Sequence, residues 1–180
     1  MPHISAPKAR NYVAQRVSAG SVDISLQAPE GRHMSHAYTK NHVHVVFSTK
    51  ERRKSIAFEV QPELWSYMAG ICRNQEMVSV AIGGVDDHVH LLFHLPATLA
   101  LSRAITLVKA NSSKWMNEHG RHFAWQEGYS AFSVSSSNLE EVAQYIRKQK
   151  EHHQKMTFED EYLSLLRKHR IEFDPEYVFG

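Results

Sequence analysis

The chain has 180 residues, 42% of them hydrophobic, which suits one globular domain with a tail and supplies enough apolar side chains for a core. No run approaches the roughly 18 apolar residues of a membrane helix, and the first residues lack the pattern of a secretory signal. Lys plus Arg (21) nearly balances Asp plus Glu (19), so a nucleic-acid-binding role would need positive charge concentrated locally. The single cysteine, Cys72, excludes an intrachain disulfide and fits a cytoplasmic setting.

Residues 1–33 show no clear apolar period and carry Pro, Ser, Gly and Gln throughout, so they predict a flexible N-terminal extension. From Met34 the sequence is more regular, and residues 34–180 are predicted to form a single domain. One hypothesis is that translation starts at Met34. A transit peptide is the alternative, because the extension bears arginines and few acidic residues.

The regular elements begin after residue 41. Residues 42–49 (HVHVVFST) alternate and are rich in β-branched side chains, which predicts a strand. Residues of about 59–75 place apolar side chains at helical spacing, with a proline near the start, which predicts a helix. Residues 77–85 and 88–95 predict two further strands, joined in a hairpin by a tight Asp-Asp turn.

Helix and strand patterns then alternate toward the C-terminus. Residues of about 99–118 predict a helix with one buried side, and residues 122–134 are strand-like and aromatic, with a break at Gly128. The serines before Asn138, and Asn138 itself, offer an N-cap for a helix over about 139–154. A further short helix is predicted at about 158–169.

The predicted order, β-α-β-β-α-β followed by a helix, is that of the split βαβ arrangement. The predicted fold class is therefore α+β, a ferredoxin-like or RRM-like sandwich with a four-stranded antiparallel sheet and two helices on one face. A C-terminal helix that carries Tyr145 follows the sandwich. Because this fold hosts many functions, function has to be argued from the side chains.

A pair of histidines opens the strand predicted at residues 88–95. His88 and His90 face the same side of that strand at roughly 7 Å, close enough to converge on one metal ion on the exposed face of the sheet. The alternative is a pair of plain surface histidines. His42 and His44 repeat the pattern, so one of the two pairs is expected to be incidental. The acidic residues just before His88 favour the second pair, because a carboxylate can orient a ligating imidazole.

The helix predicted at residues 139–154 presents a second polar pair. Tyr145 and Gln149 are four residues apart and therefore lie on one face, one turn apart, with Lys148 and His152 beside them. A phenol and an amide oxygen presented together would place a nucleophile beside a metal ligand. The alternative is that Tyr145 packs at the edge of the core while Gln149 is solvated.

Together these motifs resemble the HUH single-strand transposases that carry one catalytic tyrosine, the enzymes of the smallest bacterial insertion sequences. The resemblance covers about residues 36–180 and rests on VDDHVHLL at residues 85–92 and YIRKQ at residues 145–149. It extends to FSTK at 47–50, WQEGY at 125–129, FSV at 132–134, the histidines at 152–153, Phe158 and IEFD at 171–174.

The resemblance implies a role for each residue. Tyr145 is the expected nucleophile, and the expected ligands of one divalent metal, Mg²⁺ or Mn²⁺, are His88, His90 and Gln149. Attack on a phosphate of single-stranded DNA would give a 5′-phosphotyrosine and a free 3′-OH. Because the covalent bond conserves the phosphodiester energy, a second strand can be joined without ATP.

The resemblance also implies partners: single-stranded DNA with hairpins at the ends of the mobile element, and a second copy of the chain in a homodimer. Neither a membrane nor a nucleotide cofactor is expected. The candidate DNA contacts are Arg52, Arg53, Lys54, Lys109, Asn111, Ser112, Ser113, Lys114, Lys148 and His152, of which the last two are also candidate bases for the phenol. For each of them the alternative is a solvated surface residue.

Three alternatives stay open on sequence alone. A REP-associated tyrosine transposase would act on chromosomal repeat hairpins without moving itself, although such proteins tend to depart from glutamine at position 149. A non-catalytic sheet of the RRM type would stack bases on exposed aromatic residues, where this chain offers histidines. A metal-dependent hydrolase would use bound water and leave no covalent link between protein and DNA.

Overall fold

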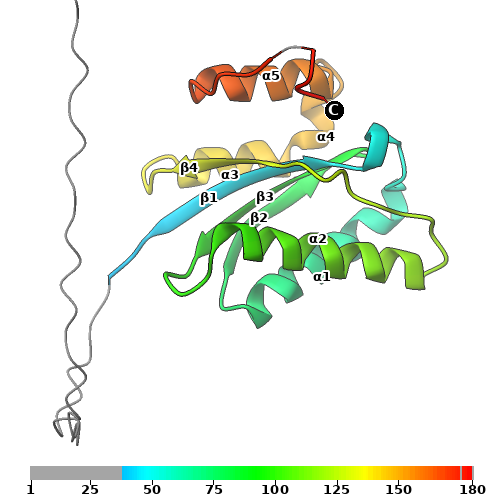
Figure 1. The fold of residues 1–180 in the computed structure, drawn as a ribbon, viewed down its shortest axis with the longest axis horizontal. Coiled ribbons are helices and arrows are strands. Elements are labelled where there is room, and N and C mark those ends of the chain that lie inside the picture. Colours follow the sequence, from blue (N-terminus) through cyan, green and yellow to red (C-terminus); the bar gives the residue numbers. More distant parts are fainter. Residues whose placement is uncertain (1–37, 175, 180) are drawn as a thin grey trace, which may run out of the picture. The chain divides into compact units, whose positions relative to one another are not determined.

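The computed structural model describes residues 38–174 and 176–179, which build a four-stranded antiparallel sheet (Figure 1). The strands are β1 (Asn41–Ser48), β2 (Val78–Gly84), β3 (His88–Leu95) and β4 (Ser130–Val134). Their order in the sheet is β2-β3-β1-β4, and every neighbouring pair is antiparallel. The predicted ferredoxin-like sheet is therefore confirmed. The predicted N-terminal extension, residues 1–33, lies outside the described residues.

Two helices cover one face of the sheet, as predicted (Figure 1). They are α1 (Gln61–Asn74) and α2 (Leu101–Glu118), with short 3-10 helices before α1 at Lys50–Arg52 and Phe58–Val60. Alternate residues of the central strands, such as Val45 and Leu91, are fully buried in the core on this side. Among the described residues, no helix is long and apolar enough to cross a membrane.

Further helices cover the opposite face of the sheet. They are α3 (Leu139–Arg147), α4 (Gln149–His152) and α5 (Phe158–Lys168). α3 packs on β2 and β3, where Ile146 belongs to the same apolar cluster as Leu92. α5 lies over the other half of the sheet, where Phe158 packs with Val46 of β1. Figure 1 shows these helices on the side of the sheet away from α1 and α2.

This second layer corrects one prediction. The histidine-bearing face of the sheet was expected to be exposed, but His88 and His90 are both fully buried. The physical reason is that α3 and α5 each carry an apolar stripe, and the second face of the sheet offers apolar residues to cover it. The same layer removes the open sheet face that an RRM-type base-stacking protein would need.

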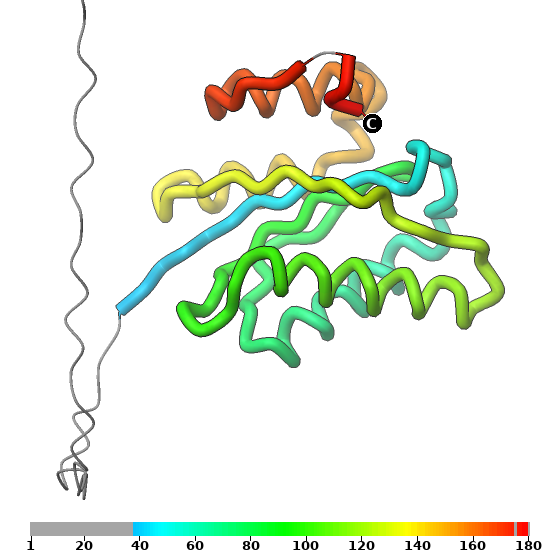
Figure 2. The backbone as a smooth tube through the Cα atoms, in the orientation of Figure 1, coloured from blue at the N-terminus to red at the C-terminus, as the bar shows by residue number. Residues whose placement is uncertain are grey.

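One predicted helix is two helices in the structure. The pattern over residues 139–154 predicts a continuous helix, but α3 ends at Arg147 and Lys148 interrupts it, with φ of −99° and ψ of 16°. Figure 2 shows the chain turning here, out of the line of α3 and toward α5. The turn brings Gln149, which is 1% exposed, into a buried polar cluster on the sheet. Local helical periodicity contains no information about that cluster.

The aromatic stretch predicted as a strand over residues 122–134 pairs as a strand only from Ser130. Before that point Trp125 makes an isolated bridge to Thr49. The Trp125 ring packs edge-on against Phe47, with ring centroids 4.8 Å apart. The aromatic pattern therefore reflects a connecting segment that packs into the core, and not an extended strand.

Gly83 of β2 sets how closely α3 approaches the sheet. A Cβ atom at this position would lie 2.3 Å from the carbonyl oxygen of Ile146. No side chain fits in that space, so the close packing of helix on strand depends on glycine. Ile146 directly follows Tyr145 in the chain, so the same contact fixes the height of that tyrosine above the sheet.

We expect Gly83→Ala to lower the free energy of unfolding by roughly 1–3 kcal/mol, because the added methyl group would overlap the backbone of Ile146. Gly70→Ala is the matched control, since a Cβ at this α1 position meets only Arg73 Nη2, at 3.9 Å. That substitution should stabilise the protein by up to about 1 kcal/mol. Urea unfolding followed by circular dichroism gives both values, and equal stabilities of the two variants would contradict the close approach of α3.

Candidate functional site

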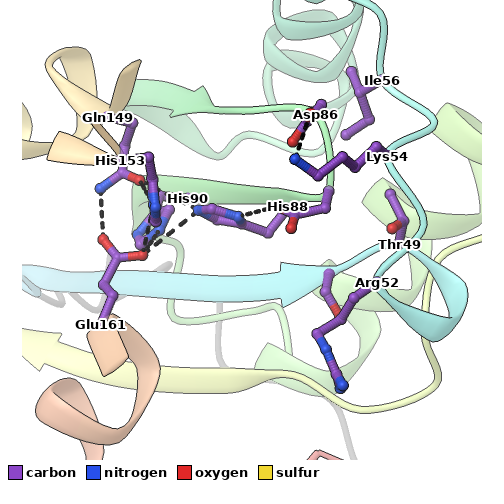
Figure 3. Close-up of polar contacts among 12 residues, drawn as sticks. Thr49, Arg52, Lys54, Ile56, Asp86, His88, His90, Gln149, His153 and Glu161 are labelled. Atoms are coloured by element: carbon purple, nitrogen blue, oxygen red, sulfur yellow. Dashed lines mark hydrogen bonds and ion pairs between the residues drawn. The ribbon is translucent and has the colours of Figure 1, made fainter. Parts of the chain in front are cut away.

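Side chains from the sheet and from the C-terminal helices that cover its second face meet in a buried polar cluster (Figure 3). Its members are His44 of β1, His88 and His90 of β3, Tyr145 of α3, Gln149 of α4, His153 just after α4, and Glu161 of α5. Five of the seven are buried, and only Tyr145 and His153 are partly accessible. Figure 3 shows the imidazoles of β3 and the side chains of Gln149 and His153 pointing toward the Glu161 carboxylate.

His88 and His90 are each held through the Nδ1 atom. His88 Nδ1 lies 2.6 Å from Asp87 Oδ1, so Nδ1 carries the proton and the Nε2 lone pair can bind a metal. His90 Nδ1 lies 2.9 Å from His44 Nε2. Both Nε2 atoms then face the centre of the cluster, where His90 Nε2 has no hydrogen-bond partner among the described residues. A buried ring nitrogen needs a partner, and a metal ion would supply one.

Both histidine motifs contribute to the cluster: the motif on β3 contributes His88 and His90, and the motif on β1 contributes only His44. The expectation that one of them is incidental is wrong for His44, which is buried and orients His90 through its ring nitrogen. His42 instead faces His94 across the ladder between β1 and β3, with ring centroids 5.7 Å apart. The register of β1 against β3 places His44 next to the cluster and pairs His42 with His94, farther along the sheet.

Glu161 lies at the centre of the cluster. Its Oε2 atom is 3.0 Å from His153 Nε2, 3.4 Å from His90 Nε2 and 3.6 Å from His88 Nε2. The carboxylate therefore faces three imidazoles at once, and it is 2% exposed.

Sequence reasoning missed Glu161, and it included His153 only as part of the family resemblance. A signal for Glu161 was present: it lies three residues after Phe158 and four before Leu165, on the same face of the helix as these apolar residues. A charged residue on the buried side of a helix is a candidate for a functional site. No comparable signal marks His153, because it lies outside the regular helices.

The predicted pair of Tyr145 and Gln149 reaches the cluster from two helices. Gln149 Oε1 lies 3.3 Å from His88 Nε2 and 3.0 Å from His153 Nε2. The Gln149 amide donates to Glu161 Oε1 at 2.8 Å, and the Tyr145 hydroxyl donates to the same oxygen. The residues predicted as nucleophile and metal ligands thus lie together in the structure.

Burial and charge set the protonation states in the cluster. Burial lowers the pKa of His90 to about 4, so this imidazole is neutral at neutral pH. Burial would raise the pKa of Glu161, but the hydrogen bond from His153, and then the nearby His90 imidazole, hold that pKa well below its usual range. Burial lowers the pKa of His153, but the bond to Glu161 outweighs this and the net pKa is raised. Burial, and then the charge of Glu161, raise the pKa of Tyr145, so its phenol is protonated at neutral pH.

Four of these side chains are placed to hold a metal ion. One ligand atom from each of His88, His90, His153 and Glu161 lies within 4.8 Å of the others. Three imidazoles and a carboxylate suit a divalent transition ion such as Mn²⁺ better than Mg²⁺, which prefers oxygen ligands. With Gln149 Oε1 beside two of the imidazoles, these residues fit a divalent metal and extend the ligand set predicted from sequence.

The DNA contacts predicted on α2 are largely engaged inside the protein. Ser112 is fully buried, where its hydroxyl donates to the backbone of its own helix and accepts from Trp125 Nε1, so this prediction is wrong. Lys109 Nζ donates to the three backbone carbonyls of residues 126–128 and holds that segment in place. The Asn111 amide donates to the backbone of its own helix.

Most of the other predicted DNA contacts are exposed and form ion pairs on the surface. The pairs are Arg52–Glu159, Arg53–Glu51, Lys54–Asp86 and Lys114–Glu118, at 2.5 to 3.7 Å. Surface pairs of this kind contribute about 0–1 kcal/mol, so Arg53, Lys54 and Lys114 can exchange them for phosphate. Arg52 is only partly exposed and also donates to the Phe179 carbonyl and lies over the Phe179 ring. Lys148 is exposed at the break after α3. His152 lies beside the tyrosine, with its ring centroid 5.2 Å from that of Tyr145.

A cavity of about 270 Å³ adjoins Tyr145. Its lining includes Glu161 and His152, and Lys168 and His169 are exposed where it meets solvent. The cavity therefore gives the phenol an approach from outside the cluster. A larger groove of about 770 Å³ runs between α1 and α2 and contains none of the cluster residues.

Comparison with known proteins gives matches over most of the described chain. Residues 37–149 match the profile of the family described as "Transposase IS200 like". Two curated relatives, the transposases for insertion sequence element IS200 of Salmonella typhimurium and Salmonella typhi, are each 26% identical over 117 residues. The matched part is 60% of this chain and 76% of each relative.

Two solved structures share the fold. A candidate transposase from Deinococcus radiodurans R1 has a TM-score of 0.52 and 22% identity, with 63% of this chain and 94% of that chain covered. A REP-associated tyrosine transposase bound to a REP hairpin has a TM-score of 0.51 and 16% identity, with 65% and 71% covered. At these identities the likeness concerns the fold alone.

We expect the affinity of the cluster for Mn²⁺ to rise as the pH is raised through and above about 6.5, the ordinary pKa of histidine. Because the pKa of His153 is raised, the metal has to displace a proton from this ring below that pKa, whereas His90, with a pKa of about 4, is already neutral. The rise should approach about tenfold per pH unit at its acid end. Titration with Mn²⁺, followed by electron paramagnetic resonance at several pH values, measures it.

His153→Asn should flatten this pH dependence, because the ring that titrates is removed. His122→Asn is the control, since this histidine is exposed and outside the cluster. If the wild-type affinity were independent of pH, His153 would not be a ligand.

Proposed function

Because the chain belongs to the family of IS200-like transposases, we propose that it cuts and rejoins single-stranded DNA with Tyr145 as the nucleophile. The observation that carries this proposal is the position of the Tyr145 hydroxyl, which donates to Glu161 at the edge of a buried cluster that fits a divalent metal. The phenol oxygen therefore lies beside the groups that would hold the metal, where the attacking atom is needed.

The cluster supplies the ligands for the metal. We assign His88, His90 and Gln149 as ligands, as the family resemblance implies, with His153 and Glu161 within reach of the same ion. When bound, the metal supplies Lewis-acid chemistry, drawing charge from a non-bridging oxygen of the phosphate. The neutral state of His90 keeps one ligand nitrogen free of a competing proton.

The reaction is a transesterification. The Tyr145 oxygen attacks phosphorus, the bond from phosphorus to the 3′ oxygen breaks, and the products are a 5′-phosphotyrosine and a free 3′-OH. In net terms the phenol proton passes to the departing 3′ oxygen. Glu161 Oε1 already accepts the hydrogen bond of this phenol and orients it, while Lys148 and His152 remain the candidate bases for its proton. Attack by the 3′-OH of another strand reverses the step and rejoins DNA.

The proposed substrate is single-stranded, because a nucleophile beside a buried cluster cannot reach a phosphate within a stacked duplex. The cavity beside Tyr145 offers a route for one strand, and Lys168 at its rim can contact the phosphate backbone. The structural relative bound to a REP hairpin supports hairpin DNA as the folded part of the substrate. A homodimer is proposed on the same family resemblance.

We favour a transposase that moves its own insertion sequence over the REP-associated type. Position 149 holds glutamine, and both curated relatives at 26% identity are transposases of an insertion sequence element. These two observations support the mobile type.

We expect Tyr145→Phe to reduce covalent protein–DNA adducts by at least about a thousandfold, because the attacking oxygen is removed. Protein is incubated with labelled single-stranded hairpin DNA from the gene's own flanks and with Mg²⁺ or Mn²⁺, then denatured and resolved on a gel. Tyr67→Phe, at a partly exposed tyrosine of α1, is the matched control and should form adducts at the wild-type level.

Cleavage without an adduct, equally strong in Tyr145→Phe, would identify a hydrolase that uses bound water. Binding of the hairpin without cleavage, in the presence of either metal, would remove the enzymatic assignment and favour a DNA-binding protein.

A further inference from the structure

Glu161 lies beyond the segment that the family profile matches. That segment ends at Gln149, whereas Glu161 belongs to α5. Its side chain is nevertheless 2% exposed and sits at the centre of the cluster. Burying a carboxylate is unfavourable unless several donors surround it, so its place on α5 requires an explanation.

The two oxygens of this carboxylate face different partners (Figure 3). Oε2 faces the imidazoles, with His153 Nε2 nearest at 3.0 Å. Oε1 faces the other side, where it accepts from the Tyr145 hydroxyl and, at 2.8 Å, from the Gln149 amide. One carboxylate thus contacts both the proposed nucleophile and the proposed metal ligands.

We propose that Glu161 is a positioning residue that bridges the nucleophile and the metal ligands, so that α5 is part of the active site. Oε1 fixes the Tyr145 hydroxyl, and Oε2 completes the metal-binding set together with His153. This inference rests on the proposed function for the role of Tyr145, but the two contacts of Glu161 can be tested independently of DNA chemistry.

Tyr145 needs such a partner because of its place on the helix. α3 ends at Arg147, only two residues after the tyrosine, and the chain then changes direction. The rings of His90 and His152 lie edge-on to the Tyr145 ring, with centroids 5.7 Å and 5.2 Å away, and they limit its tilt without holding the hydroxyl. A reacting group displaced by about 1 Å can lose about a hundredfold in rate, and the hydrogen bond to Glu161 supplies the restraint.

α5 is anchored firmly enough to serve as a fixed support. Thr157 caps its first turn by accepting a backbone N–H. Phe158 stacks on the His88 ring, with centroids 4.4 Å apart, and the Tyr162 hydroxyl lies 2.5 Å from Ser130 Oγ on β4. α5 therefore contacts both β3, which carries the proposed metal ligands, and β4 at the edge of the sheet. These contacts fix the position of the carboxylate relative to both strands.

The competing explanation is that Glu161 serves stability alone, as one partner of a buried ion pair with His153. Two substitutions separate the explanations. Glu161→Gln keeps a carbonyl oxygen that can accept from Tyr145 but loses the charged oxygen that faces the imidazoles. Glu161→Ala loses both contacts. Glu159→Gln is the matched control, because this α5 carboxylate is exposed and pairs with Arg52 outside the cluster.

Two measurements need no reaction with DNA. Mn²⁺ affinity reports the contact of Oε2, and we expect a fall of at least about tenfold in both Glu161 variants and no change in Glu159→Gln. The ring resonances of Tyr145 in protein labelled with ¹³C-tyrosine, assigned with Tyr145→Phe, report the contact of Oε1. These resonances should shift in Glu161→Ala and stay near their wild-type positions in Glu161→Gln.

The third measurement is the rate of adduct formation at saturating Mn²⁺ and DNA. We expect a loss of about a hundredfold in Glu161→Ala and recovery to within about tenfold of wild type in Glu161→Gln, with the affinity for DNA unchanged in both. A role in stability alone would lower the melting temperature of both variants while leaving the rate of the folded protein intact.

Equal rates and equal Tyr145 resonances in Glu161→Ala and wild type would overturn the inference, as would an unchanged Mn²⁺ affinity in both variants. If Glu161→Ala does not fold, Glu161→Gln still decides, because it must weaken Mn²⁺ while leaving the Tyr145 resonances in place. If the wild-type protein forms no adduct, the proposed function fails, and the Mn²⁺ and resonance measurements still test the bridge.

Discussion

Removing a carboxylate from water is unfavourable by several kcal/mol unless hydrogen-bond donors replace the lost solvent. Glu161 obtains its donors from His153, Gln149 and Tyr145, which lie between α3 and the turn after α4. These donors can meet only if the chain breaks after α3 and α5 folds back over the sheet. The requirement to surround one buried anion therefore links the position of the C-terminal helices to the imidazoles of β3.

The sheet meets this requirement because its two faces differ. One face is mainly apolar where α1 and α2 cover it, and alternate residues such as Val45 and Leu91 form a continuous core. The other face carries histidines in the middle of the sheet, with apolar residues such as Leu92 and Val46 around them. α3 and α5 pack on the apolar parts, and the polar residues between the helices form a low-dielectric site where electrostatic interactions are strong.

Several parts of the site follow from sequence because the signals are local. His88 and His90 face the same side of a strand whatever the tertiary structure, and Tyr145 and Gln149 are spaced for neighbouring turns. Other parts depend on residues distant in the chain. His44 matters because the register of β1 and β3 places it beside His90. The burial of Ser112 depends on Trp125, which enters the core from a connecting segment that resembles a strand in sequence.

By itself the sequence determined the order of the elements, the α+β sheet and the two polar pairs, because each of these depends on the period of side chains along a short segment. Only the tertiary structure decided that the histidine face is covered, that the tyrosine helix breaks at Lys148, and that Glu161 contacts both Tyr145 and the imidazoles. The physical reason is that burial of a polar group depends on partners from several elements at once, and no local pattern encodes where those elements meet.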